Sequence, residues 1–157
     1  MKKILLALFI ALGSIAVQAQ EVKWMTMDEA LAAQKKKAKP IFMDVYTDWC
    51  GPCKMLDKNT FQNKEVADYI NANYYAVKFN AEGNSEVNYK KKKYANPQYV
   101  ADKKGRNAVH EFTMLLNVRA YPTMMMFDKK GELMEPIVGY HTPEQLLPIL
   151  KERKESK

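Results

Sequence analysis

The two cysteines of this 157-residue sequence, Cys50 and Cys53, are three positions apart in a Cys-Gly-Pro-Cys motif. Such a pair suits thiol–disulfide exchange, in which an exposed thiolate attacks a disulfide and a neighbouring thiol completes the exchange. A structural staple is a weaker interpretation, because the pair closes only a tiny loop and adds little chain-entropy stabilisation. A second alternative interpretation is that the pair forms half of a zinc site. Zinc takes four ligands, however, and His110 and His141 are isolated in the sequence and far from the cysteines. We predict redox cysteines and no metal.

The elements around the pair would place Cys50 at the start of a helix. Residues 41–46 form an apolar run that predicts a buried strand, and residues 54–61 have a helical pattern. Pro52 would lie in the first turn of that helix, where its missing N–H costs nothing. Because the unpaired N–H groups and the dipole at a helix N-terminus favour negative charge, we predict Cys50 as the attacking nucleophile and Cys53 as the resolving cysteine.

The rest of the sequence alternates between helical and strand patterns without internal repeats. We expect further helices at residues 26–37, opened by a capping box, and at 64–71 and 108–116. Strands are expected at residues 74–80, 123–127 and 133–138, the last two as a hairpin around a turn at 128–131. Thr142 and Pro143 would open a final helix, in which Pro148 should produce a kink or a later start. Residues 84–107 are polar and lysine-rich, and their first part is expected to form a solvated helix.

The N-terminus has the pattern of a secretory signal peptide over residues 1–19. Lys2 and Lys3 precede an apolar run at residues 4–17, which is shorter than the roughly 20 residues that a membrane-spanning helix needs. Small residues precede a cleavage site after Ala19. An uncleaved membrane anchor is the alternative. Residues 20–157 would then form one domain, because they are enough for one hydrophobic core but not for two.

Positive charge is concentrated in three runs, at residues 35–39, 90–93 and 103–106. Removal of Lys2 and Lys3 with the signal peptide lowers the formal net charge of +7 by two, to +5. Basic runs of this kind are usually solvated faces, and no nucleic-acid-binding motif accompanies them. We therefore expect no nucleic-acid partner.

Two motifs in the sequence resemble the signatures of the thioredoxin family. Residues 49–54, Trp-Cys-Gly-Pro-Cys-Lys, are similar to that family's active-site hexapeptide, and Tyr121-Pro122-Thr123 resembles the loop whose proline peptide is cis. The order of elements fits from about Trp24 to the C-terminus, and residues 60–66 resemble the exported disulfide-reducing members. The resemblance implies an α/β thioredoxin fold, with a central mixed sheet flanked by helices and an insertion at residues 84–107 before the cis-proline loop.

The resemblance also implies roles for residues around the cysteines. Asp44 would be a buried acid that helps to deprotonate Cys53, with Lys78 as its partner and Pro122 facing the cysteines. Asp44 is a charge within an apolar strand, which is costly without a partner, although it could instead point to solvent at a strand edge, with Lys78 as an ordinary surface lysine. The substrate groove would be lined by Trp49, Gly51, Pro52 and Tyr121. Two positions depart from thioredoxin: Lys58 stands near its kinking proline, and Tyr46 replaces its usual tryptophan.

We therefore expect a secreted, monomeric thiol–disulfide oxidoreductase that reduces protein disulfides through Cys50 and Cys53 without a cofactor. Its location would be periplasmic if the source is a Gram-negative bacterium. By resemblance, its electrons would come from a membrane-embedded thiol transporter. The alternatives are an oxidase or isomerase that uses the same cysteines in the other direction, and a non-catalytic binding module.

Overall fold

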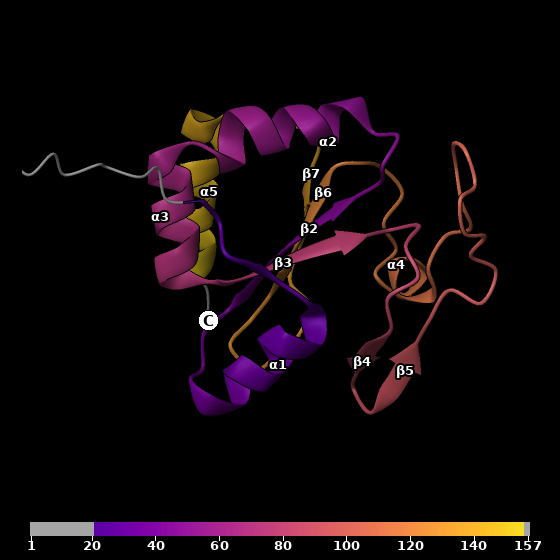
Figure 1. Ribbon diagram of the computed structural model, residues 1–157. Coiled ribbons are helices and arrows are strands. Elements are labelled where there is room, and N and C mark those ends of the chain that lie inside the picture. Colours follow the sequence, from indigo (N-terminus) through magenta and orange to yellow (C-terminus); the bar gives the residue numbers. More distant parts are fainter. Residues whose placement is uncertain (1–20, 156–157) are drawn as a thin grey trace, which may run out of the picture.

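A five-stranded mixed sheet forms the centre of the chain (Figure 1), in the strand order β1-β3-β2-β6-β7. The computed structural model describes residues 21–155, so the expected signal peptide at residues 1–19 lies outside the described part. Over these residues, none of the helices has the length and apolar character that crossing a membrane requires. The strands are β1 (Trp24–Met25), β2 (Ile41–Tyr46), β3 (Tyr75–Asn80), β6 (Thr123–Phe127) and β7 (Ile137–Val138).

Helices cover both faces of this sheet, as expected for the α/β class. Strands β1, β3 and β2 run parallel, whereas β6 and β7 are antiparallel to their neighbours. One face packs against α1 (Met27–Lys36), α4 (Glu111–Leu115) and a small hairpin of β4 (Val87–Tyr89) and β5 (Lys92–Tyr94). The other face packs against α2 (Gly51–Leu56), the π-helical turn η1 (Asp57–Phe61), α3 (Lys64–Asn73) and α5 (Pro143–Glu155).

The side chains of the central strands alternate between these two faces, because successive residues of a strand point in opposite directions. In β2, Ile41, Met43 and Val45 belong to the core cluster on the α1 face. Phe42 belongs to the cluster on the α2 face, so the alternation directs Asp44 to the α2 face as well. The strand therefore delivers one carboxyl group to the layer in which the cysteine helix lies.

The expected solvated helix at the start of residues 84–107 is wrong, because the segment forms the β4–β5 hairpin. Val87 and Tyr89 alternate with the exposed Asn88, which is the period-two pattern of a half-buried strand. Lys90 and Lys91, in left-handed conformations with φ of 49° and 63°, form the tight turn between the strands. This turn type favours asparagine and glycine, so two lysines gave no turn signal in the sequence.

This hairpin also contributes to the main core. Val87, Tyr89 and Tyr94 are buried in the same cluster as Phe112 and Phe127. The Tyr89 ring centroid lies 5.6 Å from that of Phe112 and 5.9 Å from that of Phe127. The Tyr89 hydroxyl donates to the Gly131 carbonyl over 2.9 Å. The first part of the segment that we expected as an insertion is therefore a structural part of the domain.

Several details of the elements differ from the expectation. Strand β7 covers only 137–138, because Pro136 lacks the N–H that a longer ladder would need. The helix expected at 108–116 begins at Glu111, after His110 accepts a hydrogen bond from the Phe112 N–H. His110 itself is fully buried. The final helix continues through Pro148, so a later start is wrong.

We predict that Tyr89→Ala lowers the free energy of unfolding by about 3 to 4 kcal/mol, the usual cost of removing a large buried side chain. The matched control is Tyr99→Ala in the same segment, where the side chain is half-buried and the expected loss is below about 1 kcal/mol. Urea denaturation of both variants measures the difference. Equally small losses would mean that the hairpin does not belong to the cooperative core.

Candidate active site

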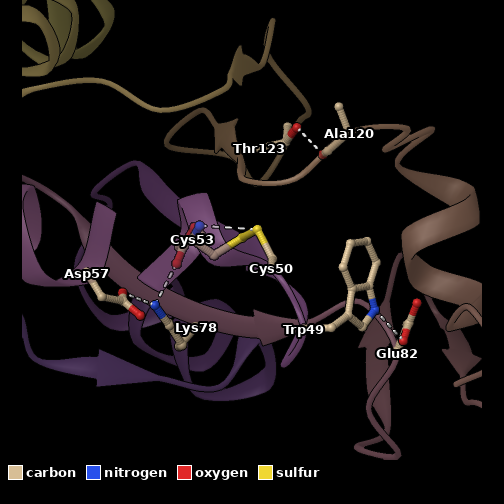
Figure 2. The surroundings of a disulfide bond; sticks show 9 residues. Trp49, Cys50, Cys53, Asp57, Lys78, Glu82, Ala120 and Thr123 are labelled. Carbon is tan, nitrogen blue, oxygen red and sulfur yellow. Dashed lines mark hydrogen bonds and ion pairs between the residues drawn. A yellow bond between two sulfur atoms is a disulfide. The ribbon is translucent and has the colours of Figure 1, made fainter. Parts of the chain in front are cut away.

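Cys50 and Cys53 form a disulfide at the first turn of α2 (Figure 2). Cys50 is the N-cap residue, with extended backbone, and its sulfur accepts a hydrogen bond from the Cys53 N–H over 3.1 Å. Serine and aspartate oxygens usually occupy this capping position. Gly51 and Pro52 complete the first turn and are exposed. The expectation that a helix begins at Cys50, shortly after the strand ends, is thus confirmed.

We expected the attacking cysteine to be exposed, but in this disulfide form Cys50 is buried. Its residue exposure is 3%, against 2% for Cys53, so burial does not distinguish the two. Their positions in the helix do distinguish them, because the Cys50 sulfur lies at the helix N-terminus, where unpaired N–H groups stabilise negative charge. Cys53 lies inside the helix and is followed one turn later by Asp57.

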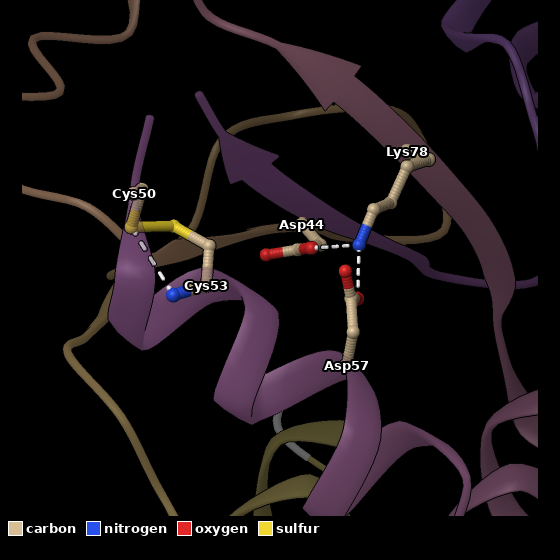
Figure 3. A network of polar contacts seen from close by, with 5 residues as sticks. All are labelled: Asp44, Cys50, Cys53, Asp57 and Lys78. Carbon is tan, nitrogen blue, oxygen red and sulfur yellow. Dashed lines mark hydrogen bonds and ion pairs between the residues drawn. A yellow bond between two sulfur atoms is a disulfide. The ribbon is translucent and has the colours of Figure 1, made fainter. Parts of the chain in front are cut away.

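A buried ion pair lies beneath the cysteines (Figure 3). Asp44 of β2 is directly paired in register with Lys78 of β3, and the alternation of both strands places the two side chains on the α2 face. The Lys78 Nζ lies 2.6 Å from Asp44 Oδ2 and also contacts a carboxylate oxygen of Asp57. Asp44 is fully buried, so the solvent-facing alternative for this residue is wrong.

The second oxygen of Asp44 points away from the lysine. Asp44 Oδ1 is buried and has no hydrogen-bond partner among the described residues. Figure 3 shows the carboxylate between Lys78 and the Cys53 side chain. Because an unsatisfied buried oxygen is costly, it marks a position that can accept a proton from the cysteine side of the site.

Burial dominates the electrostatics of this network. It raises the pKa of Asp44 from 3.8 to about 6, although Lys78 opposes the shift. Burial lowers the pKa of Lys78, but the two carboxylates outweigh it, so the pKa of the lysine is raised overall. A carboxyl with a pKa in this range is suited to proton transfer near neutral pH.

Aromatic rings and a small hollow surround the lysine. Its Nζ lies 4.9 Å from the ring centroid of Tyr46 and 5.0 Å from that of Trp24. The tyrosine that replaces the usual tryptophan of the resembled family thus supports the lysine as a cation–π partner. A hollow of about 260 Å³ beside Lys78 and Asp57 opens the network on one side.

Trp49 and Tyr121, two of the residues expected to line a substrate groove, are in contact. Trp49 is 38% exposed, and its ring meets that of Tyr121 edge to face with centroids 5.9 Å apart. The Tyr121–Pro122 peptide is cis, as expected. Figure 2 shows the adjacent Ala120 and Thr123 among the surroundings of the disulfide. The two sequence motifs therefore meet at one site.

Four residues of the site were missed by sequence reasoning. Asp57 had a local signal, since it follows Cys53 by four positions and so lies on the same side of the helix. Glu82 accepts hydrogen bonds from Trp49 Nε1 over 3.0 Å and from the Asn107 N–H over 2.7 Å. The Arg106 guanidinium lies 4.3 Å from the Trp49 ring centroid. Glu82, Arg106 and Asn107 approach Trp49 only through the tertiary fold, so nothing local in the sequence identifies them.

The site combines a pair of sulfur atoms with a lysine and two carboxylates. Across residues 21–155 there is no group of three or more histidine, cysteine, aspartate or glutamate side chains that could hold a metal ion. The polar centre of the site is a lysine between two carboxylates, next to a pair of sulfur atoms. Such an arrangement can move a proton near a thiol that undergoes exchange.

Comparisons with known proteins agree with this geometry. A family model described as a thioredoxin-like domain matches residues 27–154. Thioredoxin of Acidithiobacillus ferridurans is 29% identical over 115 residues, which are 73% of this chain and 80% of that protein. The thiol:disulfide interchange protein DsbD of Citrobacter koseri is 30% identical over 126 residues, which are 77% of this chain but 18% of that protein. The structure of a thioredoxin from Thermus thermophilus has a TM-score of 0.62 and 14% identity, covers 85% of this chain and 87% of that chain, and so shows the fold.

We predict that Asp44→Asn stabilises the disulfide form at alkaline pH but not at acidic pH. The carboxyl has a higher pKa in the folded chain than in the unfolded one, so its contribution to stability is fully present below about pH 4. That contribution is lost as the pH rises through about 6, which costs the wild-type protein about 2 to 3 kcal/mol. Urea denaturation of wild type and variant between pH 4 and 8 measures this divergence.

The matched control is Asp48→Asn, which changes an exposed carboxylate of the neighbouring loop. Its stability should differ from that of the wild type by the same small amount at every pH. A constant difference between wild type and Asp44→Asn across this range would contradict the raised pKa of Asp44.

Proposed function

Because the chain belongs to the thioredoxin-like domain family, we propose that it is an exported reductase of protein disulfides, which cycles Cys50 and Cys53 between dithiol and disulfide. The observation that carries the proposal is the position of the Cys50 sulfur as the N-cap of α2. A sulfur at this position is the one whose thiolate the helix stabilises.

The proposed cycle has two exchange steps. The Cys50 thiolate attacks one sulfur of the substrate disulfide, forms a mixed disulfide and releases the other substrate sulfur as a thiolate. The Cys53 thiol gives its proton to the Asp44 carboxylate, and the resulting thiolate attacks the Cys50 sulfur. This step forms the Cys50–Cys53 disulfide and releases the second substrate thiolate. The substrate gains two electrons, and the protein dithiol loses them.

The direction of transfer depends on how strongly the Cys50 thiolate is stabilised. Strong stabilisation favours the dithiol form and makes an oxidant, whereas weaker stabilisation makes a reductant. Gly51 and Pro52 carry no charge, and the hydrogen bond that the Cys50 sulfur accepts comes from a backbone N–H. This environment supports a reductase, with a reduction potential close to the −270 mV or so of thioredoxin.

Export and electron supply complete the proposal. The basic, apolar and small-residue pattern of residues 1–19 supports secretion, and the periplasm would be the destination in a Gram-negative bacterium. A reductase in an oxidising compartment needs electrons from elsewhere. The similarity to part of DsbD, a protein named for thiol:disulfide interchange, supports a membrane thiol transporter as the donor.

The reduction potential tests the direction of the proposed reaction. Purified protein is equilibrated with glutathione buffers, the thiols are trapped by alkylation, and the two forms are quantified by mass. We predict a potential near about −270 mV, and Cys53→Ser, which cannot form the internal disulfide, provides the control without this transition. A value above about −180 mV would favour an oxidase or isomerase instead.

A further inference from the structure

Residues 100–107, hereafter the basic loop, form a closed loop beside the active site. Its ends are joined by Asn107, whose side-chain amide donates to the Val100 carbonyl over 2.7 Å and accepts from the Val100 N–H over 3.0 Å. Asn96 fixes the base of the loop, because its side chain donates to the carbonyls of Gly83 and Ala108. The loop is therefore held in position although its tip is exposed.

The basic loop is connected directly to the residue before Cys50. One carboxylate oxygen of Glu82 accepts hydrogen bonds from both Trp49 Nε1 and the Asn107 N–H. Figure 2 shows the indole of Trp49 directed toward Glu82. The guanidinium of Arg106 lies on the Trp49 ring, 4.3 Å from its centroid. The Arg106 cation, from a distant segment, is thus held against Trp49, the residue that precedes the proposed nucleophile Cys50.

The cations of this loop have no acidic partners among residues 21–155. Lys103, Lys104 and Arg106 are exposed, and Asp102 is the single acid of the loop. None of the three cations takes part in an ion pair within the described residues. In contrast, Lys90 and Lys93 of the β4–β5 hairpin pair with Glu132 and Glu86. The positive field of the basic loop is therefore available to a partner.

We propose that the basic loop is a docking surface for protein disulfides that carry acidic residues next to the reactive cysteine. The inference rests on the proposed function. Trp49 directly precedes Cys50, and its partly exposed ring carries Arg106. Aspartate or glutamate beside the substrate cysteine would then lie close to the three unpaired cations, which favours encounter and selects against basic partners.

The experiment uses three disulfide-linked peptides that differ only in the residues flanking the cysteine, which are aspartate, asparagine or lysine. The second-order rate constant for oxidation of the reduced wild-type protein is measured with each peptide. Each rate constant is divided by the rate constant for reduction of the same peptide by dithiothreitol, which corrects for differences in the intrinsic reactivity of the three peptide disulfides. We expect the aspartate peptide to react roughly fivefold faster than the asparagine peptide at low salt, the size of effect that one or two exposed ion pairs give, and the preference to shrink in 0.5 M salt.

Variants assign the preference to the loop. Replacing Lys103, Lys104 and Arg106 by glutamine should abolish it, and replacing all three by glutamate should make the lysine peptide react fastest. The matched control, Lys35→Gln with Lys36→Gln and Lys37→Gln, removes the same charge from exposed positions at the end of α1 and should keep the preference. Circular dichroism confirms that each variant is folded.

Two results would overturn the inference in distinguishable ways. A wild-type protein that reduces all three peptides at equal normalised rates, or a preference that the glutamate variant does not invert, excludes the docking surface and leaves the proposed function intact. A reduced wild-type protein that transfers electrons to none of the peptides excludes the proposed function, and with it the inference.

Discussion

The capping of α2 by the sulfur of Cys50 is the interaction on which the rest of the site depends. It requires the chain to leave β2 with extended backbone and to enter a helix within a few residues, which Gly51 and Pro52 allow because neither position needs an N–H partner. The same hydrogen bond directs the first N–H groups of the helix toward sulfur. Unpaired N–H groups at a helix N-terminus favour negative charge, so the fold itself would stabilise a thiolate at Cys50.

The second constraint is a carboxyl group kept in an apolar layer. The alternation that buries Phe42 against the α2 face sends Asp44 to the same side, where Lys78 meets it in register. Burial raises its pKa to about 6, and its Oδ1 has no hydrogen-bond partner among the described residues. Such a group destabilises the folded chain at neutral pH, and in the proposed cycle it is the proton acceptor for Cys53. Asp57 gives the lysine a second carboxylate partner.

Sequence reasoning found the parts of the site that are encoded locally. The cysteine pair, the helix start, the apolar strand with Asp44 and the cis proline each depend on neighbouring residues or on a short motif, and each is present. It failed where residues distant in sequence decide the outcome. The β4–β5 hairpin is stabilised by packing against Phe112 and Phe127, and the contacts of Arg106 and Glu82 with Trp49 arise only when the long segment folds back. The burial of Cys50 in the disulfide is likewise a tertiary property.

The pH dependence of alkylation of the reduced protein tests the central claim most directly, namely that the helix end makes Cys50 the nucleophile. Mass spectrometry after short exposure to iodoacetamide reports the reaction at each cysteine separately. The account predicts that Cys50 reacts first at every pH, because the helix end favours its thiolate and so lowers its pKa below the roughly 8.5 of a free cysteine. Faster labelling of Cys53, or a pKa of Cys50 at or above that of a free cysteine, would contradict it.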